Sequence, residues 1–159
     1  MRLDLDDFPL LSRLTGTWQG DFICLDADGG PKRRYSCIIN QRIANGRWVQ
    51  TNDNSYDDGS ADRWRFFGHA IGAGVMQLES PDPPFCDFCM TASEAAPHVL
   101  LLVVRLERTG AVLATEAFTL IDPSRRTRAI QQFDAETGDP QGFMLVKERK
   151  MAAPTAHSD

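Results

Sequence analysis

A set of aromatic, amide and guanidinium side chains alternates at every second position along two neighbouring stretches, residues 47–54 and 60–69. An Asp58-Gly59 pair between them is typical of a two-residue hairpin turn, which would place the set on one face of the hairpin. Aromatic rings stack on apolar ligands, amides orient a polar end, and arginine can hold a carboxylate through two hydrogen bonds. The pattern predicts a ligand-binding face consisting of Trp48, Gln50, Asn52, Arg63, Arg65, Phe67 and His69.

The opposite orientation of this hairpin is also open. A register slip of one residue would exchange the two faces. Arg63 and Arg65 would then face water on the outside of the sheet, and Trp64 and Phe66 would point inward. The sequence alone does not decide between these two orientations.

The cysteines are candidates for metal or redox chemistry. Cys86 and Cys89 form one C-x-x-C motif, but no second pair at zinc-finger spacing accompanies it. Prolines just before the motif predict an irregular loop over a barrel, with Phe85 and Phe88 packing onto it, rather than a redox-active helix. We therefore predict no metal site. The residues expected to be free thiols are Cys24, Cys37, Cys86 and Cys89.

Candidate acids and bases are few. His69 lies at the end of an expected strand, where it could serve as a base. Glu79 and Glu116 lie in apolar-patterned strands, where burial would raise the pKa of a carboxyl group. No residue is assigned a catalytic role, and no cofactor is predicted.

Stretches of alternating apolar and polar residues recur at a spacing of roughly ten to twelve residues, with turn-forming residues between them. A sheet of this size avoids exposed edges most simply by closing on itself. The predicted fold class is therefore all-β, a closed antiparallel up-and-down barrel of about eight to ten strands. The expected strands span residues 17–25, 34–42, 47–54, 60–67, 75–79, 89–93, 99–107, 112–121, 126–133 and 142–149.

Only residues 6–16 before the first strand have a helical pattern. Asp6 or Asp7 is the expected N-cap and Gly16 the expected stop, so the helix would cover one barrel mouth. We predict one domain over residues 1–150. Residues 151–159 are expected to form a disordered tail.

The triplet Gly16-Thr17-Trp18 begins the first expected strand. It resembles the G-x-W signature of the calycin superfamily, which includes the lipocalins. The longer stretch 14–68 resembles a lipocalin-like family of unknown function seen in cyanobacteria and related bacteria. A large inward ring at this position would fill the barrel base, and glycine permits the sharp entry from the helix.

The resemblance implies an up-and-down barrel around a small-molecule cavity, but it implies no particular ligand. It also implies an arginine from a late strand over the Trp18 ring, for which Arg126 and Arg149 are the candidates. Haem-binding calycins use a histidine late in the barrel. Residues 126–149 contain no histidine, so haem is disfavoured.

The chain of 159 residues has a net charge of −5, with basic and acidic residues interspersed. It therefore lacks the basic surface that nucleic acids require. No apolar run approaches the ~18 residues that span a bilayer, and the acidic N-terminus differs from a secretory signal. We expect a cytoplasmic protein that binds no nucleic acid and does not insert into a membrane.

The stretch Val99–Val104 is apolar on both faces, although a barrel strand needs only one apolar face. Its outer side must be covered by the N-terminal helix or by a second copy of the chain. A homodimer through this strand is therefore a hypothesis.

Three functions are compatible with these observations. The first is binding of a small apolar or amphipathic molecule in the barrel, as a carrier or sequestration protein. The second is a cofactor-independent enzyme, a cyclase, an isomerase or a lyase for bilin chromophores, that uses the same cavity. The third is a filled barrel with a structural or interaction role. We favour small-molecule binding.

Overall fold

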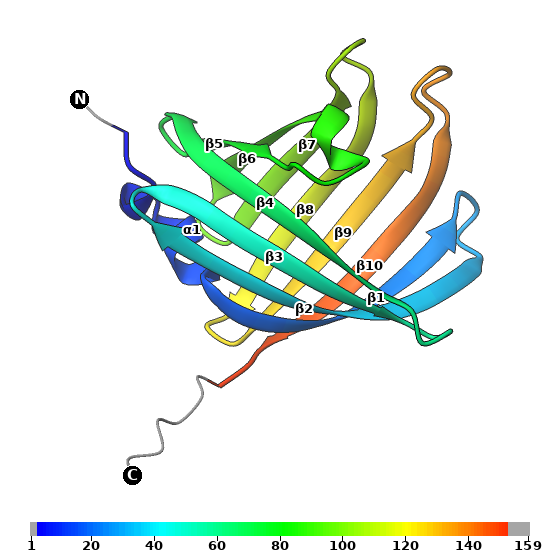
Figure 1. The fold of residues 1–159 in the computed structure, drawn as a ribbon, viewed down its shortest axis with the longest axis horizontal. Coiled ribbons are helices and arrows are strands. Elements are labelled where there is room, and N and C mark those ends of the chain that lie inside the picture. Colours follow the sequence, from blue (N-terminus) through cyan, green and yellow to red (C-terminus); the bar gives the residue numbers. More distant parts are fainter. Residues whose placement is uncertain (1–2, 153–159) are drawn as a thin grey trace.

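A computed structural model describes residues 3–152, which form a closed barrel of ten antiparallel strands (Figure 1). Each strand pairs with its neighbours in the sequence, and pairing of the first strand with the last closes the barrel. This confirms the predicted up-and-down topology. The strands are β1 (Gly16–Asp26), β2 (Pro31–Ala44), β3 (Arg47–Tyr56), β4 (Ala61–Gly72), β5 (Val75–Glu79), β6 (Phe88–Ala96), β7 (Val99–Leu106), β8 (Val112–Asp122), β9 (Arg125–Phe133) and β10 (Pro140–Lys150).

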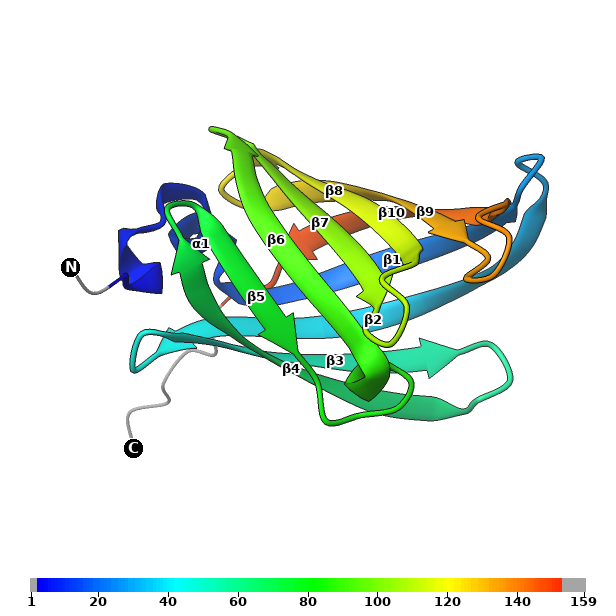
Figure 2. The ribbon, with the colours of Figure 1, turned by 90° about the horizontal axis from the view of Figure 1, so that it is seen from above.

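One end of the barrel, which we call the base, is covered by the N-terminal helices η1 (Leu5–Asp7) and α1 (Pro9–Leu14), as Figure 2 shows. The predicted N-cap is wrong. Asp6 and Asp7 lie inside η1, and α1 begins after Phe8 without a side-chain cap. The free main-chain N–H groups at the start of α1 donate instead to a carboxylate of β6, because a long side chain from the barrel wall can reach a helix that sits on it.

That carboxylate belongs to Glu94. Its Oε1 accepts hydrogen bonds from the main-chain nitrogens of Leu10 and Leu11, at 2.7 and 2.8 Å. Leu10, Leu11 and Leu14 are buried against the barrel interior. The helix is thus fixed to the base by both charge and apolar packing.

Trp18 fills the base of the barrel. The side chain is fully buried, and its indole N–H donates to the main-chain oxygen of Leu14 at 2.9 Å. The guanidinium of Arg126 lies 4.1 Å from the ring centroid, so Arg126 is the arginine over the ring, and Arg149 is exposed. Gly16 adopts a φ of +129°, which permits the turn from α1 into β1.

The predicted register between β3 and β4 is wrong by one residue. Asp57, Asp58 and Gly59 form a three-residue loop, in which Tyr56 N donates to Ser60 O and only Gly59 has positive φ. A two-residue turn of the predicted type needs positive φ at both central residues. This loop shifts the pairing of β4 with β3 by one residue from the predicted register. The opposite face of β4 therefore points inward.

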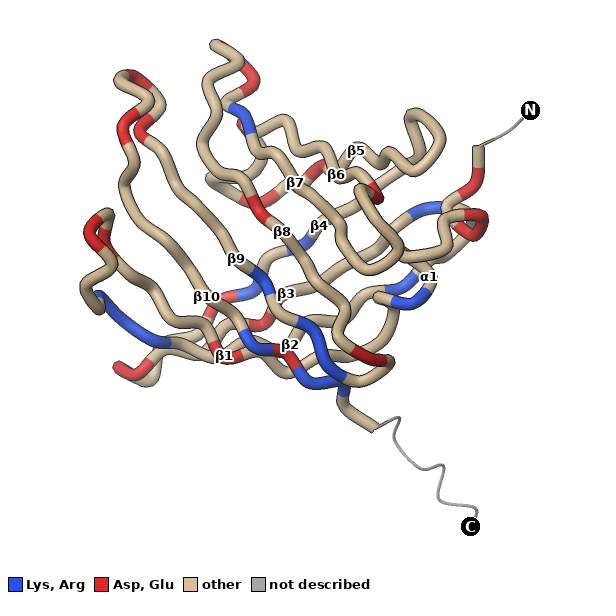
Figure 3. The backbone as a smooth tube through the Cα atoms, turned by 180° about the vertical axis from the view of Figure 1, so that it is seen from behind, with Lys and Arg blue, Asp and Glu red and all other residues tan. Residues whose placement is uncertain are grey.

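The five hairpin turns opposite the base surround the end that we call the mouth. They span residues 27–30, 57–60, 80–87, 107–111 and 134–139, and Figure 3 shows acidic residues at these turns. The turns at the base, 45–46, 73–74, 97–98 and 123–124, contain none. The mouth turns contain one basic residue, Arg108. Their acidic residues are Asp28, Asp57, Asp58, Asp82, Asp87, Glu107, Asp134, Glu136 and Asp139.

Most of the expected disordered tail, residues 153–159, lies outside the described residues. No helix within residues 3–152 has the length and apolar character needed to cross a bilayer.

Candidate functional site: the barrel lumen

On most strands, inward-facing side chains become more accessible from the base to the mouth; Asn54 on β3 and Met90 on β6, each 2% exposed, are exceptions. Trp18 and Ile39 near the base are fully buried, whereas Phe118 and Tyr35 at mid-height each keep 7% of their surface exposed. Nearer the mouth, the inner wall is only partly buried, so solvent enters the barrel from this end. We call the space within this wall the lumen; its partly buried wall residues are Cys24, Tyr56, Trp64, Phe88, Val104, Ala114 and Met144.

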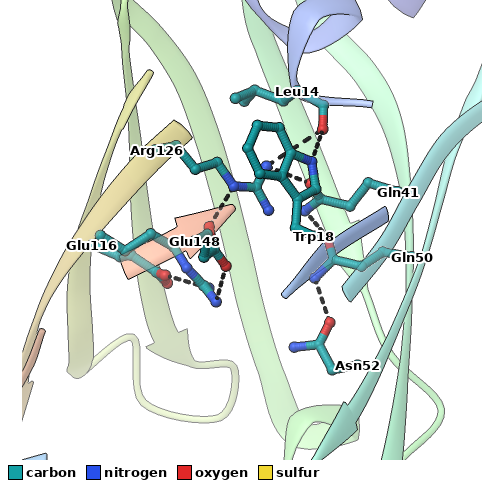
Figure 4. Close-up of polar contacts among 9 residues, drawn as sticks. Leu14, Trp18, Gln41, Gln50, Asn52, Glu116, Arg126 and Glu148 are labelled. Carbon is teal, nitrogen blue, oxygen red and sulfur yellow. Dashed lines mark hydrogen bonds and ion pairs between the residues drawn. The ribbon is translucent and has the colours of Figure 1, made fainter. Parts of the chain in front are cut away.

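The floor of the lumen carries two arginines and two glutamates, whose formal charges cancel. Arg128 is ion-paired to Glu116 through Nη1 at 2.9 Å and to Glu148 through Nη2 at 2.8 Å. Glu148 also accepts a hydrogen bond from Arg126 Nε, so it holds both arginines (Figure 4). Buried charges need such partners, because desolvation of an unpaired ion costs several kcal/mol.

Arg128 is held between two aromatic rings. Its guanidinium carbon lies 4.8 Å from the ring centroids of Phe22 and Phe118. This stacking keeps the cation at the centre of the floor. Its Nε has no hydrogen-bond partner among the described residues and is fully enclosed, so a ligand cannot reach it directly.

Glu116 is the carboxylate of this cluster with the fewest partners. Oε1 accepts from Arg128, but Oε2 has no partner among the described residues, and the side chain is 10% exposed. Burial raises the pKa of Glu116, because the nearby arginines only partly offset the loss of hydration. Burial also lowers the pKa of Arg126 to about 10. The second acid candidate, Glu79, is exposed.

A chain of amide side chains runs from the base up the wall on β2 and β3. Arg126 Nη1 donates to Gln41 Oε1 at 2.7 Å, and Gln41 Nε2 donates to Gln50 Oε1 at 2.9 Å. Gln50 Nε2 donates in turn to Asn52 Oδ1 at 2.9 Å. Trp48 Nε1 also donates to Gln50 Oε1, at 2.9 Å. Figure 4 shows the chain from Arg126 to Asn52.

The structure therefore brings three predicted site residues, Trp48, Gln50 and Asn52, together on the inner wall. Their role in binding a ligand remains a prediction. The ring that pairs with Asn52 across the hairpin is Trp64, not the predicted Arg65. The aromatic part of the predicted face is therefore supplied by Trp64 and its neighbours on β4.

The four predicted site residues of β4 lie on the outside of the barrel, because of the register shift. Arg63 pairs with Asp53 at 2.5 Å, and its side chain is 65% exposed. Phe67 is 38% exposed. His69 lines a shallow depression near Asn45-Gly46, outside the lumen. The prediction that these four side chains face the lumen is therefore wrong.

Arg65 holds the loop that covers one side of the mouth. Its main-chain nitrogen and its Nη2 donate to the two carboxylate oxygens of Asp82, at 2.6 and 2.8 Å. The loop continues into the short helix η2 (Phe85–Asp87). Phe85 packs edge-on against Trp64 and Phe66, with centroids 4.9 and 5.0 Å away, which confirms the predicted packing of this loop onto the barrel.

The four cysteines are free. Cys37 is buried on β2, and burial raises the pKa of its thiol to about 12, whereas Cys86 is exposed in η2. Within residues 3–152, no three His, Cys, Asp or Glu side chains are grouped as a metal site requires.

Comparisons with known proteins place the fold. A DUF3598-family protein of unknown function from Nostoc punctiforme matches 89% of this chain at 18% identity and a TM-score of 0.59. This chain spans only 49% of that protein. An S-type phycobiliprotein lyase from Guillardia theta matches 96% of this chain, over 95% of its own length, at 12% identity and a TM-score of 0.70. The chain has a calycin-like barrel fold.

A redesigned β-barrel also matches, over 92% of this chain and 98% of its own, at 10% identity and a TM-score of 0.50. No protein-family model matches the sequence, and no curated protein is significantly similar to it. At these identities the likeness concerns the fold alone. The chemistry of this chain must therefore be argued from its own lumen.

Sequence reasoning missed three polar residues of the lumen, Gln41, Arg128 and Glu148. Residues 147–150 are all charged, so alternation gives no sign of which of them faces inward. Arg126 and Arg128 on β9 alternate with Thr127 and Ala129, a pattern typical of an ordinary strand with a solvated polar face. Only the positions of their partners on other strands identify them as buried.

Proposed function

We propose that the protein binds a small amphipathic molecule in its lumen and that the ligand enters through the mouth. The observation that carries this proposal is the gradient of exposure along the inner wall, from the fully buried Trp18 to the partly exposed Trp64. A closed base and an open, aromatic-lined mouth are the features that small-molecule sites share.

The chemistry of the wall indicates the kind of ligand. Aromatic rings line the mid-height and the mouth, and Phe22 and Tyr35 stack with centroids 4.6 Å apart. Glu116 on the floor and Asn52 on the amide wall offer polar atoms. Such a lumen suits a molecule with an apolar body and one polar end. We favour binding over catalysis, because the two other predicted acid or base candidates, Glu79 and His69, do not face the lumen.

Titration with Nile red, a neutral dye whose emission shifts to the blue in apolar surroundings, tests this proposal. We expect a saturable blue shift with the wild-type protein. Ala114→Trp places a ring in the lumen and should weaken binding at least about tenfold. Ser55→Trp adds the same ring to the outer face of β3 and should leave binding unchanged.

The absence of any saturable shift, or equal effects of the two substitutions, would contradict lumen binding and favour a filled barrel. Biliverdin is a useful second probe, because one fold neighbour is a phycobiliprotein lyase. An absorbance change on its addition would extend the ligand class to bilins.

The homodimer remains a prediction. α1 covers the base, and it leaves the outer face of β7 free, where Leu101 is 45% exposed. Leu101 lies in a row with Ala117, Ala129 and Leu145, one residue from each of four adjacent strands. Sedimentation at high concentration should detect a dimer that Leu101→Lys dissociates, and a wild-type monomer would contradict it.

A further inference from the structure

We propose that Asn52 is a pre-oriented hydrogen-bond donor for the ligand. Its side-chain NH₂ group would bind an uncharged acceptor oxygen, as in a ketone or an amide. The ligand class is then narrowed to amphipathic molecules that carry a carbonyl at the end inserted first. This inference rests on the proposed function, because it assumes that a ligand occupies the lumen.

The orientation of the Asn52 amide follows from groups that can only donate. Arg126 has no acceptor, so the Gln41 atom that it contacts must be oxygen, and the Gln41 NH₂ group then points to Gln50. Trp48 Nε1 is likewise a donor only, and it contacts the same Gln50 oxygen at 2.9 Å. Two independent donors therefore fix Gln50 with its NH₂ group toward Asn52.

Asn52, the last amide in this series of hydrogen bonds, consequently accepts from Gln50 through Oδ1, and its NH₂ group points away from Gln50 (Figure 4). Nδ2 of Asn52 has no hydrogen-bond partner among the described residues. Asn52 retains 7% exposure, and Nδ2 is not one of the fully enclosed atoms that lack a partner, so solvent reaches it. A donor that is fixed in direction and accessible only to the lumen is suited to a ligand oxygen.

The charges of the barrel favour an uncharged acceptor over a carboxylate. The mouth turns carry nine acidic residues and one basic residue, so their net charge opposes the entry of an anion, although Arg33 on β2 places one cation over the rings of Tyr35 and Tyr56. At the floor, the arginines already have carboxylate partners, and Glu116 Oε2 is the open atom. A neutral carbonyl can bind Asn52 without repulsion from the acidic mouth turns or from Glu116.

The test uses two nearly isosteric neutral probes, 2-acetylnaphthalene and 2-isopropenylnaphthalene, which differ in C=O against C=CH₂. Each is titrated against bound Nile red, and its inhibition constant is measured. We expect the wild type to prefer the ketone by about three- to tenfold, the range of one net hydrogen bond. Asn52→Asp retains an acceptor for Gln50 but removes the donor, so this preference should disappear.

Asn40→Asp is the matched control. Asn40 is exposed on β2, where its amide contacts Thr17, and the same substitution there should leave the preference unchanged. Should Asn52→Asp fail to fold, the ¹⁵N side-chain resonances of the wild type provide the second measurement. The Asn52 NH₂ signals should shift with the ketone and much less with the alkene.

The outcomes separate the two proposals. Equal affinity of the wild type for both probes overturns the inference and leaves lumen binding intact. The same holds if Asn52→Asp keeps the preference. If neither probe displaces Nile red and Nile red itself does not bind, the proposed function fails and the inference fails with it.

Discussion

The base and the mouth of this barrel are formed by the same strands but differ in how tightly their side chains are packed. At the base, Trp18, Leu14 and Arg126 are packed to between 0 and 2% exposure, and the helix α1 covers them. At the mouth, rings such as Trp64 remain partly exposed, and acidic turns keep the rim hydrated. The difference indicates that stability resides at the base, which leaves the mouth free to accommodate a ligand.

The largest expected effect tests this division directly. Trp18→Ala should lower the free energy of unfolding by about 3–5 kcal/mol, because it removes a fully buried ring and leaves a cavity under α1. Trp64→Ala should cost clearly less, since part of that ring is already in contact with water. Urea unfolding followed by circular dichroism measures both. Equal losses would contradict the division.

A second pair of substitutions compares buried with exposed charge. Glu148→Gln removes the carboxylate that holds both floor arginines and should destabilise the protein by about 3 kcal/mol, because two buried cations lose a partner. Asp53→Asn breaks the exposed pair with Arg63 and should cost at most about 1 kcal/mol. If Asp53→Asn lowered the free energy of unfolding as much as Glu148→Gln, the floor cluster would contribute no more to stability than an exposed ion pair.

Glu116 lies where base and mouth meet, and it predicts a pH dependence. Its pKa in the folded protein is raised above the ordinary 4.5, so folding favours the protonated acid. The contribution of Glu116 to stability is therefore greatest below pH 4.5 and is lost as the pH rises through its folded-state value. The unfolding free energy of wild type should fall relative to Glu116→Gln over this range, and a difference independent of pH would refute the assignment.

The last prediction concerns the thiols and compares their accessibility. At pH 8, iodoacetamide should modify the exposed Cys86 at least about a hundredfold faster than Cys37, which is enclosed and has few thiolates at that pH. Mass spectrometry of the peptides measures both rates. In urea the two rates should converge, and equal rates in the folded protein would mean that the Cys37 thiol is as accessible as that of Cys86.

The sequence predicted the strands well because alternation along one strand is a local property. All ten expected strands are present, and the stretch 75–79 is reproduced end to end as β5. The register of β3 with β4 was not predictable in this way. An Asp-Gly pair occurs in both two- and three-residue loops, and the choice between them decides whether Arg63 or Trp64 faces the lumen.

The polar floor was also beyond sequence reasoning, for a different reason. Arg128, Glu116 and Glu148 lie on three strands, and each is tolerated in the interior only because the others are there. A pattern along one strand cannot reveal a partner on another. In contrast, the ring of Trp18 and its covering arginine follow from a local motif and a family resemblance, and Arg126 was among the predicted candidates.

The most direct test of the central claim, that a ligand binds above a closed base, uses the three tryptophans as reporters. Trp18 lies at the base, Trp48 on the amide wall and Trp64 near the mouth. In protein labelled with 5-fluorotryptophan, saturation with Nile red should shift the ¹⁹F resonance of Trp64 strongly and leave that of Trp18 in place. A shift confined to Trp18, or no shift in any of the three, would contradict the account.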